Sequence, residues 1–307
     1  MSSEIEGGTY VVLDPRFKTC ISDERVERLW TGTNFSEGPA WFPAGRYLVW
    51  SDVLRGNKMM RWDETDGSVS VFREPSNFSN GNTVDLQGRL VTCEHLSRSV
   101  TRTEHDGKIT TIASHFQGKR FNSPNDVVVK SDGSIWFSDP TYGIDSDNEG
   151  AKASPEIDGC HVYRVDPGTG VVKQMTVDMV RPNGLAFSPD ESILYIADTG
   201  VTHVKNGPQH IRRFRVGAEG ALSGGEVFAV SSNGLFDGFR VDAQGRIWTS
   251  AGDGIHCIEP DGTLIGKILI PEPVGNLTFG GPKRNRLLIC ATTSLYGVHV
   301  NATGASR

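Results

Sequence analysis

The stretch SPNDVVVKSDGSIWFSDP, Ser123–Pro140, contains the pattern that decides the fold. It begins with polar residues, runs through an apolar segment, turns at Asp132-Gly133 and runs through a second apolar segment. Two short apolar runs joined by an Asp-Gly turn are typical of a β-hairpin. Five other segments repeat the pattern: SEGPAWFPAGRYLVWSD from Ser36, SNGNTVDLQGRLVTCEH from Ser79, RPNGLAFSPDESILYIADT from Arg181, LFDGFRVDAQGRIWTSAG from Leu235 and VGNLTFGGPKRNRLLICAT from Val274.

The six copies predict an all-β protein, a six-bladed β-propeller of four-stranded blades. The turn glycines Gly45, Gly88 and Gly133 are 43 and 45 residues apart, which is the period of a propeller blade. Later spacings stretch at two insertions, 142–159 and 201–209, and no segment has sustained helical periodicity. A third strand is expected after most hairpins, at 58–62, 99–103, 161–165, 210–214 and 254–258.

The ends of the chain suggest how the ring closes. The sixth copy runs out of chain near Val300 before a convincing fourth strand, and the extended segment Val26–Trp30 precedes the first copy. A strand supplied from the other terminus would protect the edges that an open sheet exposes. We therefore expect one domain over 1–307, with an N-terminal extension at 1–25 and six blades over 26–307.

Composition narrows the function classes. The net charge of -6 and pI near 5.8 provide no basic footprint for nucleic acid. Residues 1–8 lack the features of a secretory signal, and no apolar run is long enough to span a bilayer. The five widely spaced cysteines fit reduced thiols. We expect a cytoplasmic protein, or a periplasmic one if a signal peptide has been lost; the oligomeric state is not indicated.

Aligned on their turns, the copies share one polar position where the first strand opens. Because that strand lines the central channel, the six side chains should converge on the axis. Six oxygen-bearing groups, two of them anionic, suit Ca²⁺, which takes about six to eight oxygen ligands. Zn²⁺ would favour His or Cys, although Mg²⁺, Mn²⁺ or Zn²⁺ could also occupy the site. The six residues are Glu37, Asn80, Asn125, Asn183, Asp237 and Asn276.

A simpler interpretation of this ring is local turn chemistry. Asn80-Gly81, Asn183-Gly184 and Asp237-Gly238 are turn dipeptides that could merely mark strand entries. That interpretation explains Glu37-Gly38 and Asn125-Asp126 less well, since Glu is not a turn former. The coincidence across six copies favours a metal for the set.

Several segments carry a family resemblance, the longest being NSPNDVVVKSDGSIWFSDPTYGI at 122–144. The others are SEGPAW at 36–41, GRLVTCEH at 88–95, PNGLAFSPD at 182–190, ADT at 197–199 and DGFRVDAQGRIW at 237–248. On these motifs the chain resembles the SMP-30/gluconolactonase/luciferin-regenerating-enzyme family from about Val26 to His299, and most closely its bacterial gluconolactonases. The resemblance implies a Ca²⁺-dependent lactone hydrolase with its metal at the channel mouth.

The resemblance also implies roles for individual residues. The family's metal ligands fall on Glu37, Asn183 and Asp237, with Asn125 as a direct or water-mediated fourth ligand. Asn80 and Asn276 are left as channel-lining residues, and substrate contacts are expected from Glu37, Asn80 and Asn125. Mammalian relatives carry a substrate-binding Arg two residues before the Asn125 position, where this chain has Ser123, so the sugar contacts differ.

Lactone hydrolysis builds negative charge on the carbonyl oxygen, which a bound cation can stabilise, and it needs a base to activate water. Asp237 is the first candidate for that base. Asp139 is the rival, although it could simply be a strand-ending Asp before Pro. His95 could donate to a substrate hydroxyl, or could have no special role. The 142–159 insertion could be part of a lid or a solvated loop.

Other hydrolase and nucleotide signatures are absent. There is no G-x-S-x-G, H-E-x-x-H, Walker loop or G-x-G-x-x-G motif. The leading hypothesis is a lactonase acting on a small-molecule lactone, with no nucleic-acid or membrane partner. The alternatives are an organophosphate or aryl-ester hydrolase on the same metal scaffold, and a non-catalytic propeller that binds proteins.

Overall fold

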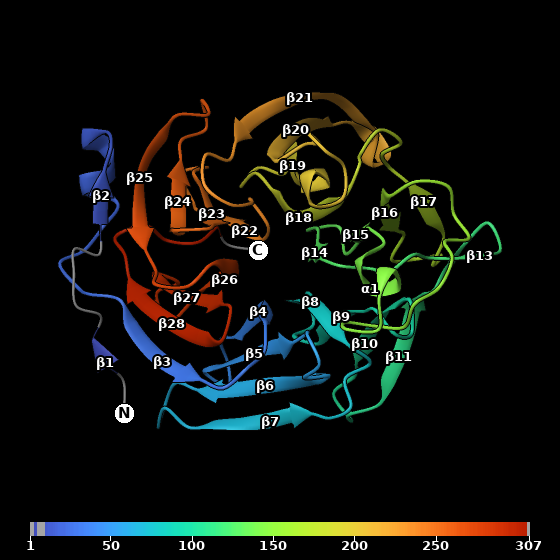
Figure 1. The fold of residues 1–307 in the computed structure, drawn as a ribbon, viewed down its shortest axis with the longest axis horizontal. Coiled ribbons are helices and arrows are strands. Elements are labelled where there is room, and N and C mark those ends of the chain that lie inside the picture. The colour runs from blue at the N-terminus through green and yellow to red at the C-terminus, as the bar shows by residue number, and fades with distance from the viewer. Residues whose placement is uncertain (1–2, 5–9, 306–307) are drawn as a thin grey trace.

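The fold is taken from a computed structural model, which describes residues 3–4 and 10–305 of the 307-residue chain. Six antiparallel sheets stand around a common axis (Figure 1). In each sheet the strands follow chain order from the axis outward, except where the N-terminal segment adds strands. The prediction of an all-β, six-bladed propeller is confirmed.

The first three blades consist of four strands each. Blade 1 contains β4 (Ser36–Phe42), β5 (Tyr47–Asp52), β6 (Lys58–Asp63) and β7 (Val69–Arg73). Blade 2 contains β8 (Ser79–Val84), β9 (Leu90–Glu94), β10 (Ser99–Thr103) and β11 (Ile109–Ala113). Blade 3 contains β14 (Val127–Val129), β15 (Ile135–Asp139), β16 (His161–Val165) and β17 (Val172–Gln174).

The last three blades continue the same order. Blade 4 contains β18 (Pro182–Phe187), β19 (Ile193–Asp198), β20 (His210–Val216) and β21 (Leu222–Val230). Blade 5 contains β22 (Phe239–Val241), β23 (Ile247–Ala251), β24 (Gly254–Ile258) and β25 (Leu264–Leu269). Blade 6 contains β26 (Val274–Gly280), β27 (Arg286–Ala291) and β28 (Ser294–His299). The five predicted third strands all form, two of them slightly longer than expected.

Apolar side chains from neighbouring blades fill the space between them. The second strands of blades 1, 3 and 5 carry Trp50, Trp136 and Trp248, each fully buried. Trp136 packs with Leu185 and Phe187 from blade 4, so one core cluster spans two blades. Truncating such a side chain to Ala costs about 3–5 kcal/mol, and every blade interface therefore contributes to the stability of the ring.

The fourth strand of blade 6 comes from the N-terminal part of the chain. β3 (Glu27–Thr31) pairs antiparallel with β28, placing Trp30 opposite Leu295. This confirms that the segment predicted at Val26–Trp30 closes the ring. The short β1 (Ser3–Glu4) pairs with the outer edge of β3.

The rest of the N-terminal extension packs on blade 5. β2 (Tyr10–Val12) pairs with β25, and a 3₁₀ helix η1 (Pro15–Thr19) follows. The buried Phe17 ring from η1 lies against Gly266, where an added Cβ would come within 2.1 Å of it. The extension is thus part of the packed structure from Tyr10 onward.

The remaining elements are short. A two-stranded hairpin, β12 (His115–Phe116) and β13 (Lys119–Arg120), extends from blade 2. The insertions carry α1 (Tyr142–Asp145) and η2 (Gly200–Thr202), and η3 (Ala218–Gly220) precedes β21. Within the described part of the chain, no helix has the length and apolar character needed to cross a membrane. All five cysteines are buried free thiols.

Deleting residues 1–31 should abolish cooperative unfolding, because β28 would lose its outer hydrogen-bonded partner and blade 6 an entire strand. The matched control is deletion of residues 1–25, which removes the packing of Phe17 but keeps β3. We expect that control to unfold cooperatively at a lower temperature, as followed by circular dichroism and calorimetry. Equal cooperativity in the two truncations would contradict a ring-closing role for β3.

Candidate functional site

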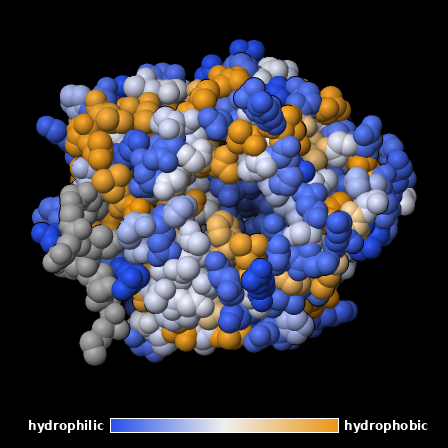
Figure 2. All heavy atoms as spheres, in the orientation of Figure 1, coloured by the Kyte–Doolittle hydropathy of each residue, from blue (hydrophilic) through white to orange (hydrophobic). Residues whose placement is uncertain are grey.

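A cavity of about 210 Å³ lies on the propeller axis, and five of the six predicted ring residues line it. Figure 2 shows a hollow in the middle of the ring, with hydrophilic atoms around much of it. The sixth residue, Asn276, lies behind the wall and donates from Nδ2 to Glu37 Oε2 at 3.0 Å. The structure therefore brings the ring together, with Asn276 supporting Glu37. The five that line the cavity are Glu37, Asn80, Asn125, Asn183 and Asp237.

Irregular strand pairing points these side chains at the axis. In blades 1, 2, 4 and 6 the register between first and second strands shifts at or beside the ring position. In blades 3 and 5 the ring residues Asn125 and Asp237 precede β14 and β22 by two positions, so they do not open a strand as the sequence suggested. Such bulges re-aim side chains and are common beside active sites.

The glycines after the ring positions have a packing role. Gly81 and Gly184 lie inside β8 and β18 and have ordinary φ angles. A Cβ on Gly81 would lie 2.4 Å from Asn125 O, and one on Gly184 would lie 2.2 Å from Asp237 O. The strand-entry-turn interpretation is therefore wrong for these two glycines, which let neighbouring inner strands touch.

The two ring carboxylates are electrostatically strained. Burial raises the pKa of Glu37 to about 7, and the negative charge of Asp126 adds to this rise. Burial also raises the pKa of Asp237 well above its usual value, with further contributions from Glu37 and Asp126. Neither Glu37 nor Asp237 forms an ion pair within residues 3–4 and 10–305. A cation between them would relieve both the burial cost and the repulsion.

The donors fit a hard cation. The cavity wall offers ring carboxylates and amides and contains neither His nor Cys, which suits Ca²⁺ better than Zn²⁺. In the region that the structure describes, no group of three or more His, Cys, Asp or Glu residues could hold a metal ion. The ring does not form such a group because amides make up most of it.

A larger cavity, of about 580 Å³, lies further along the inner strands and contains none of the six ring residues. Its wall is mainly apolar and includes Trp41, Val129, Phe187 and Phe279. Size alone would favour it, but its two carboxylates, Asp85 and Glu191, are already paired with Arg89 and Lys130, and we therefore take the smaller cavity as the candidate site.

Asp139, the rival candidate for the base, is buried outside the cavity lining. Its two carboxylate oxygens accept the backbone N–H groups of Asn122 and Ser123, each at 2.8 Å, and burial raises its pKa to about 7. Asp52 and Asp198 end the second strands of blades 1 and 4 and likewise each accept two backbone N–H groups from the loop before the first strand; Asp198 also accepts Gly200 N at 3.1 Å. The three residues share a loop-clamping position.

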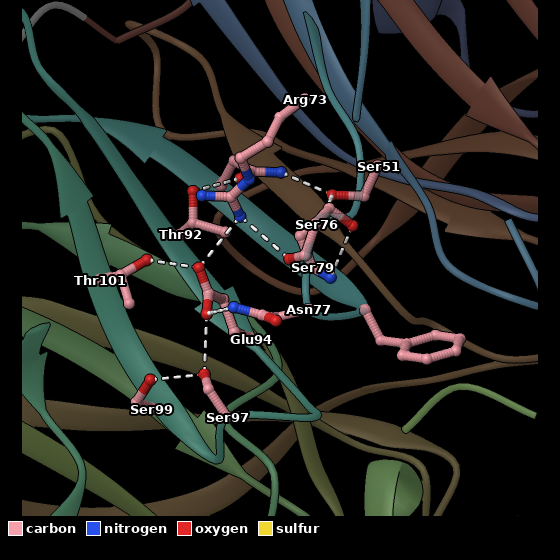
Figure 3. A network of polar contacts seen from close by, with 12 residues as sticks. Ser51, Arg73, Ser76, Asn77, Ser79, Thr92, Glu94, Ser97, Ser99 and Thr101 are labelled. Carbon is pink, nitrogen blue, oxygen red and sulfur yellow. Dashed lines mark hydrogen bonds and ion pairs between the residues drawn. The ribbon is translucent and has the colours of Figure 1, made fainter. Parts of the chain in front are cut away.

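Glu94 occupies the same position in blade 2 and binds side chains instead (Figure 3). Its Oε1 accepts from Arg73 at 3.0 Å and Thr101 at 2.9 Å, while Oε2 accepts from Asn77 at 2.9 Å and Ser97 at 2.7 Å. The longer Glu side chain extends past the backbone that Asp would cap, so this blade closes its loop with a side-chain network.

His95 is completely buried and does not line the cavity. Its Nδ1 lies 3.0 Å from the carbonyl oxygen of Glu149, and its Nε2 lies 3.2 Å from Asn80 Nδ2. Burial lowers the pKa of His95 to about 4, so its imidazole is neutral at physiological pH. The structure thus places His95 behind Asn80, where it contacts the ring residue rather than the cavity.

Sequence reasoning missed part of the cavity wall. Tyr142 and Glu149 from the first insertion and Thr202 from the second line the cavity. The Tyr142 hydroxyl lies 2.8 Å from Thr199 Oγ1 and 3.0 Å from Thr202 Oγ1, which ties the two insertions together. The sequence marked the 142–159 insertion as a possible lid, which agrees with its place in the cavity wall, but no repeat pattern covers insertions and none of these three residues was singled out. The apolar part of the wall comes from Phe35, Val53, Leu54 and Leu235.

Residues 35–293 match the family model described as the SMP-30/Gluconolactonase/LRE-like region. The chain belongs to this family. Its curated relatives include the gluconolactonase of Zymomonas mobilis, 29% identical over 91% of this chain and 82% of the relative. Another is the pentonolactonase XacC of Haloferax volcanii, 27% identical over 84% of this chain and 82% of the relative.

Solved structures agree with this family membership. The gluconolactonase XC5397 of Xanthomonas campestris superimposes with a TM-score of 0.90 at 38% identity, covering 98% of this chain and 97% of that one. The calcium-binding protein regucalcin of Agrobacterium tumefaciens has a TM-score of 0.73 at 21% identity, covering 91% and 94%. At that identity regucalcin supports the propeller fold only.

Replacing Asp237 with Asn should stabilise the cation-free protein, because one of two mutually repelling carboxylates becomes neutral. We expect the melting temperature to rise by about 2–4 °C, which corresponds to ~1 kcal/mol in a large domain. In the wild type, Ca²⁺ at about 100 times its Kd should add about 2.7 kcal/mol, and the variant should lose most of this gain. Differential scanning fluorimetry with and without Ca²⁺ measures both effects.

The control for this prediction is Asp106→Asn, in an exposed turn where Asp106 Oδ1 accepts from Lys108 N. An amide oxygen can accept the same bond, so both melting temperatures should match the wild type. A lower cation-free melting temperature for Asp237→Asn, with the Ca²⁺ response intact, would contradict the cation assignment.

Proposed function

We propose that the chain is a Ca²⁺-dependent lactonase that hydrolyses a sugar lactone, with glucono-1,5-lactone converted to gluconate. The observation that carries the proposal is the convergence of Glu37 and Asp237 with three amide side chains in one small cavity on the axis. The names of its relatives, gluconolactonase and pentonolactonase, support the same substrate class.

The size and lining of the cavity suit a substrate molecule that consists of a single small ring. Its volume of about 210 Å³ is below the ~300–1,000 Å³ that is typical of pockets for drug-sized ligands. Phe35 and Leu235 provide apolar surface, and the ring residues provide polar groups. This combination favours a compact substrate that has both ring carbons and oxygens to bury.

Four ring residues would hold the cation: Glu37, Asn183 and Asp237, with Asn125 directly or through a water. A bound Ca²⁺ would stabilise the negative charge that develops on the lactone carbonyl oxygen during water attack. The Glu37 carboxylate is kept in position by two hydrogen bonds to its Oε2, one donated by Gly38 N at 2.7 Å and one by Asn276 Nδ2 at 3.0 Å. Such fixed donors orient the ligand set before substrate arrives.

Asp237 is our candidate for the general base, because its carboxylate lies in the cavity wall and can accept the proton of an attacking water. Its backbone N–H donates to Ser250 Oγ at 2.9 Å, which fixes the position of its main chain. Asp139 is less suited to the role, since both of its oxygens already accept backbone N–H groups.

Turnover of glucono-1,5-lactone in a pH-stat should disappear with EDTA and return with added Ca²⁺. Asp237→Ala should reduce kcat/KM by at least about 10²-fold, the scale of losing one group that stabilises or activates in the transition state, while circular dichroism remains that of the wild type. EDTA-resistant turnover, or near-normal activity of Asp237→Ala, would be inconsistent with the proposal.

A pair of matched variants separates the two candidate bases. Asp139→Asn should cost about 1–3 kcal/mol of stability, because a backbone N–H would face an amide NH₂ or lose its partner, and the folded fraction should retain its kcat. Asp198→Asn removes the equivalent clamp in blade 4 and should behave alike. A specific loss of kcat in Asp139→Asn, with cation affinity unchanged, would make Asp139 the base.

A further inference from the structure

Glu149 is the only carboxylate in the described cavity wall that does not belong to the ring. No hydrogen bond from the described residues reaches its carboxylate group, whose Oε2 lies 3.6 Å from His95 Nδ1. The side chain is 23% exposed, and the residue forms part of the cavity wall. Burial raises the pKa of Glu149 to about 7, and above that pH its carboxylate offers two acceptor oxygens to whatever occupies the cavity.

The insertion that carries Glu149 is anchored at this residue and just before it. The backbone N–H of Arg55 donates to Asn148 O at 2.9 Å, and His95 Nδ1 lies 3.0 Å from Glu149 O. Nearer the start of the insertion, Arg181 Nη1 donates to Asp145 Oδ2 at 2.7 Å. The Glu149 side chain thus projects from a held backbone, which reduces the entropy lost when it binds a ligand.

His95 connects this insertion to the ring. Because a carbonyl oxygen can only accept, Nδ1 must carry the proton, which leaves Nε2 as an acceptor for Asn80 Nδ2. This arrangement fixes the orientation of the Asn80 amide. No hydrogen bond from the described residues reaches Asn80 Oδ1, and Asn80 lines the cavity, so a second fixed acceptor stands beside the first.

We infer that Glu149 and Asn80, positioned through His95, form a hydrogen-bond-accepting wall that selects lactones with hydroxyl groups on the ring over unsubstituted lactones. The inference rests on the proposed lactonase function and adds the residues that read the substrate. A hydroxylated lactone supplies donors to both acceptors. An unsubstituted lactone removes water from these acceptors without replacing the hydrogen bonds that the water made. A site built this way discriminates strongly against the unsubstituted lactone.

The experiment compares kcat/KM for glucono-1,5-lactone and δ-valerolactone, a six-membered lactone without hydroxyl groups, in a pH-stat with Ca²⁺ present and uncatalysed hydrolysis subtracted. In Glu149→Leu, which has no acceptor, the preference for gluconolactone should fall at least about 10-fold, mainly through KM. Glu149→Gln retains an acceptor oxygen and should restore most of the preference.

Two further variants test position rather than chemistry. Glu156 lies on the same insertion but outside the cavity lining, where its Oε2 accepts from Arg120 N at 2.8 Å. The variant Glu156→Leu should therefore keep the wild-type preference. His95→Phe removes both ring-nitrogen contacts and should lower the preference as Glu149→Leu does. If His95→Phe does not fold, the two Glu149 variants decide the question.

The outcomes distinguish this inference from the function on which it rests. Wild-type protein that hydrolyses neither lactone would overturn the lactonase proposal, and this inference with it. Wild-type turnover with an unchanged preference in Glu149→Leu would overturn the accepting wall alone. An equal loss on both lactones, or a loss of Ca²⁺ affinity measured by calorimetry, would overturn it too, because Glu149 would then be structural or a cation ligand.

Discussion

The contact between inner strands of neighbouring blades is the constraint on which the site depends. At Gly81 and Gly184 the backbone of one blade lies so close to the next that a Cβ would overlap its carbonyl oxygen. Hydrogen bonds follow from the same approach, from Gly81 N to Asn125 O at 2.7 Å and from Gly184 N to Asp237 O at 3.0 Å. The acceptor residues are themselves ring residues, so the packing that closes the axis also positions the polar groups on it.

That packing forces like charges together. Glu37 and Asp237 face one cavity with Asp126 nearby, and burial together with mutual repulsion raises the pKa of both ring carboxylates. A protein selected for stability alone would have amides at both positions, as this chain has at the other four ring positions. Natural proteins break their own folding rules mainly at functional sites, and the two carboxylates fit the functional site proposed here.

The acids at the ends of the second strands contrast with those on the axis. Asp52, Asp139 and Asp198 each accept two backbone N–H groups from the loop that leads into the first strand, and so hold that loop. The donors around an acidic residue near the axis therefore distinguish a loop clamp from the proposed general base. In Asp139 these donors occupy both oxygens, whereas the Asp237 carboxylate has none within the described residues.

The sequence by itself determined the six blades, because hydrophobic alternation and turn spacing repeat in every blade. It also determined how the propeller closes, because the sixth copy lacks a fourth strand and the extended segment Val26–Trp30 can supply it. It also pointed to the polar ring, since equivalent positions of a repeat must meet at its axis. Only the tertiary structure decided that Asn276 supports Glu37, that Asp139 clamps a loop and that His95 lies behind Asn80. It also brought Tyr142 and Glu149 into the cavity. Insertions follow no repeat, and the partners of a buried polar group come from other blades, so neither could be derived from local pattern.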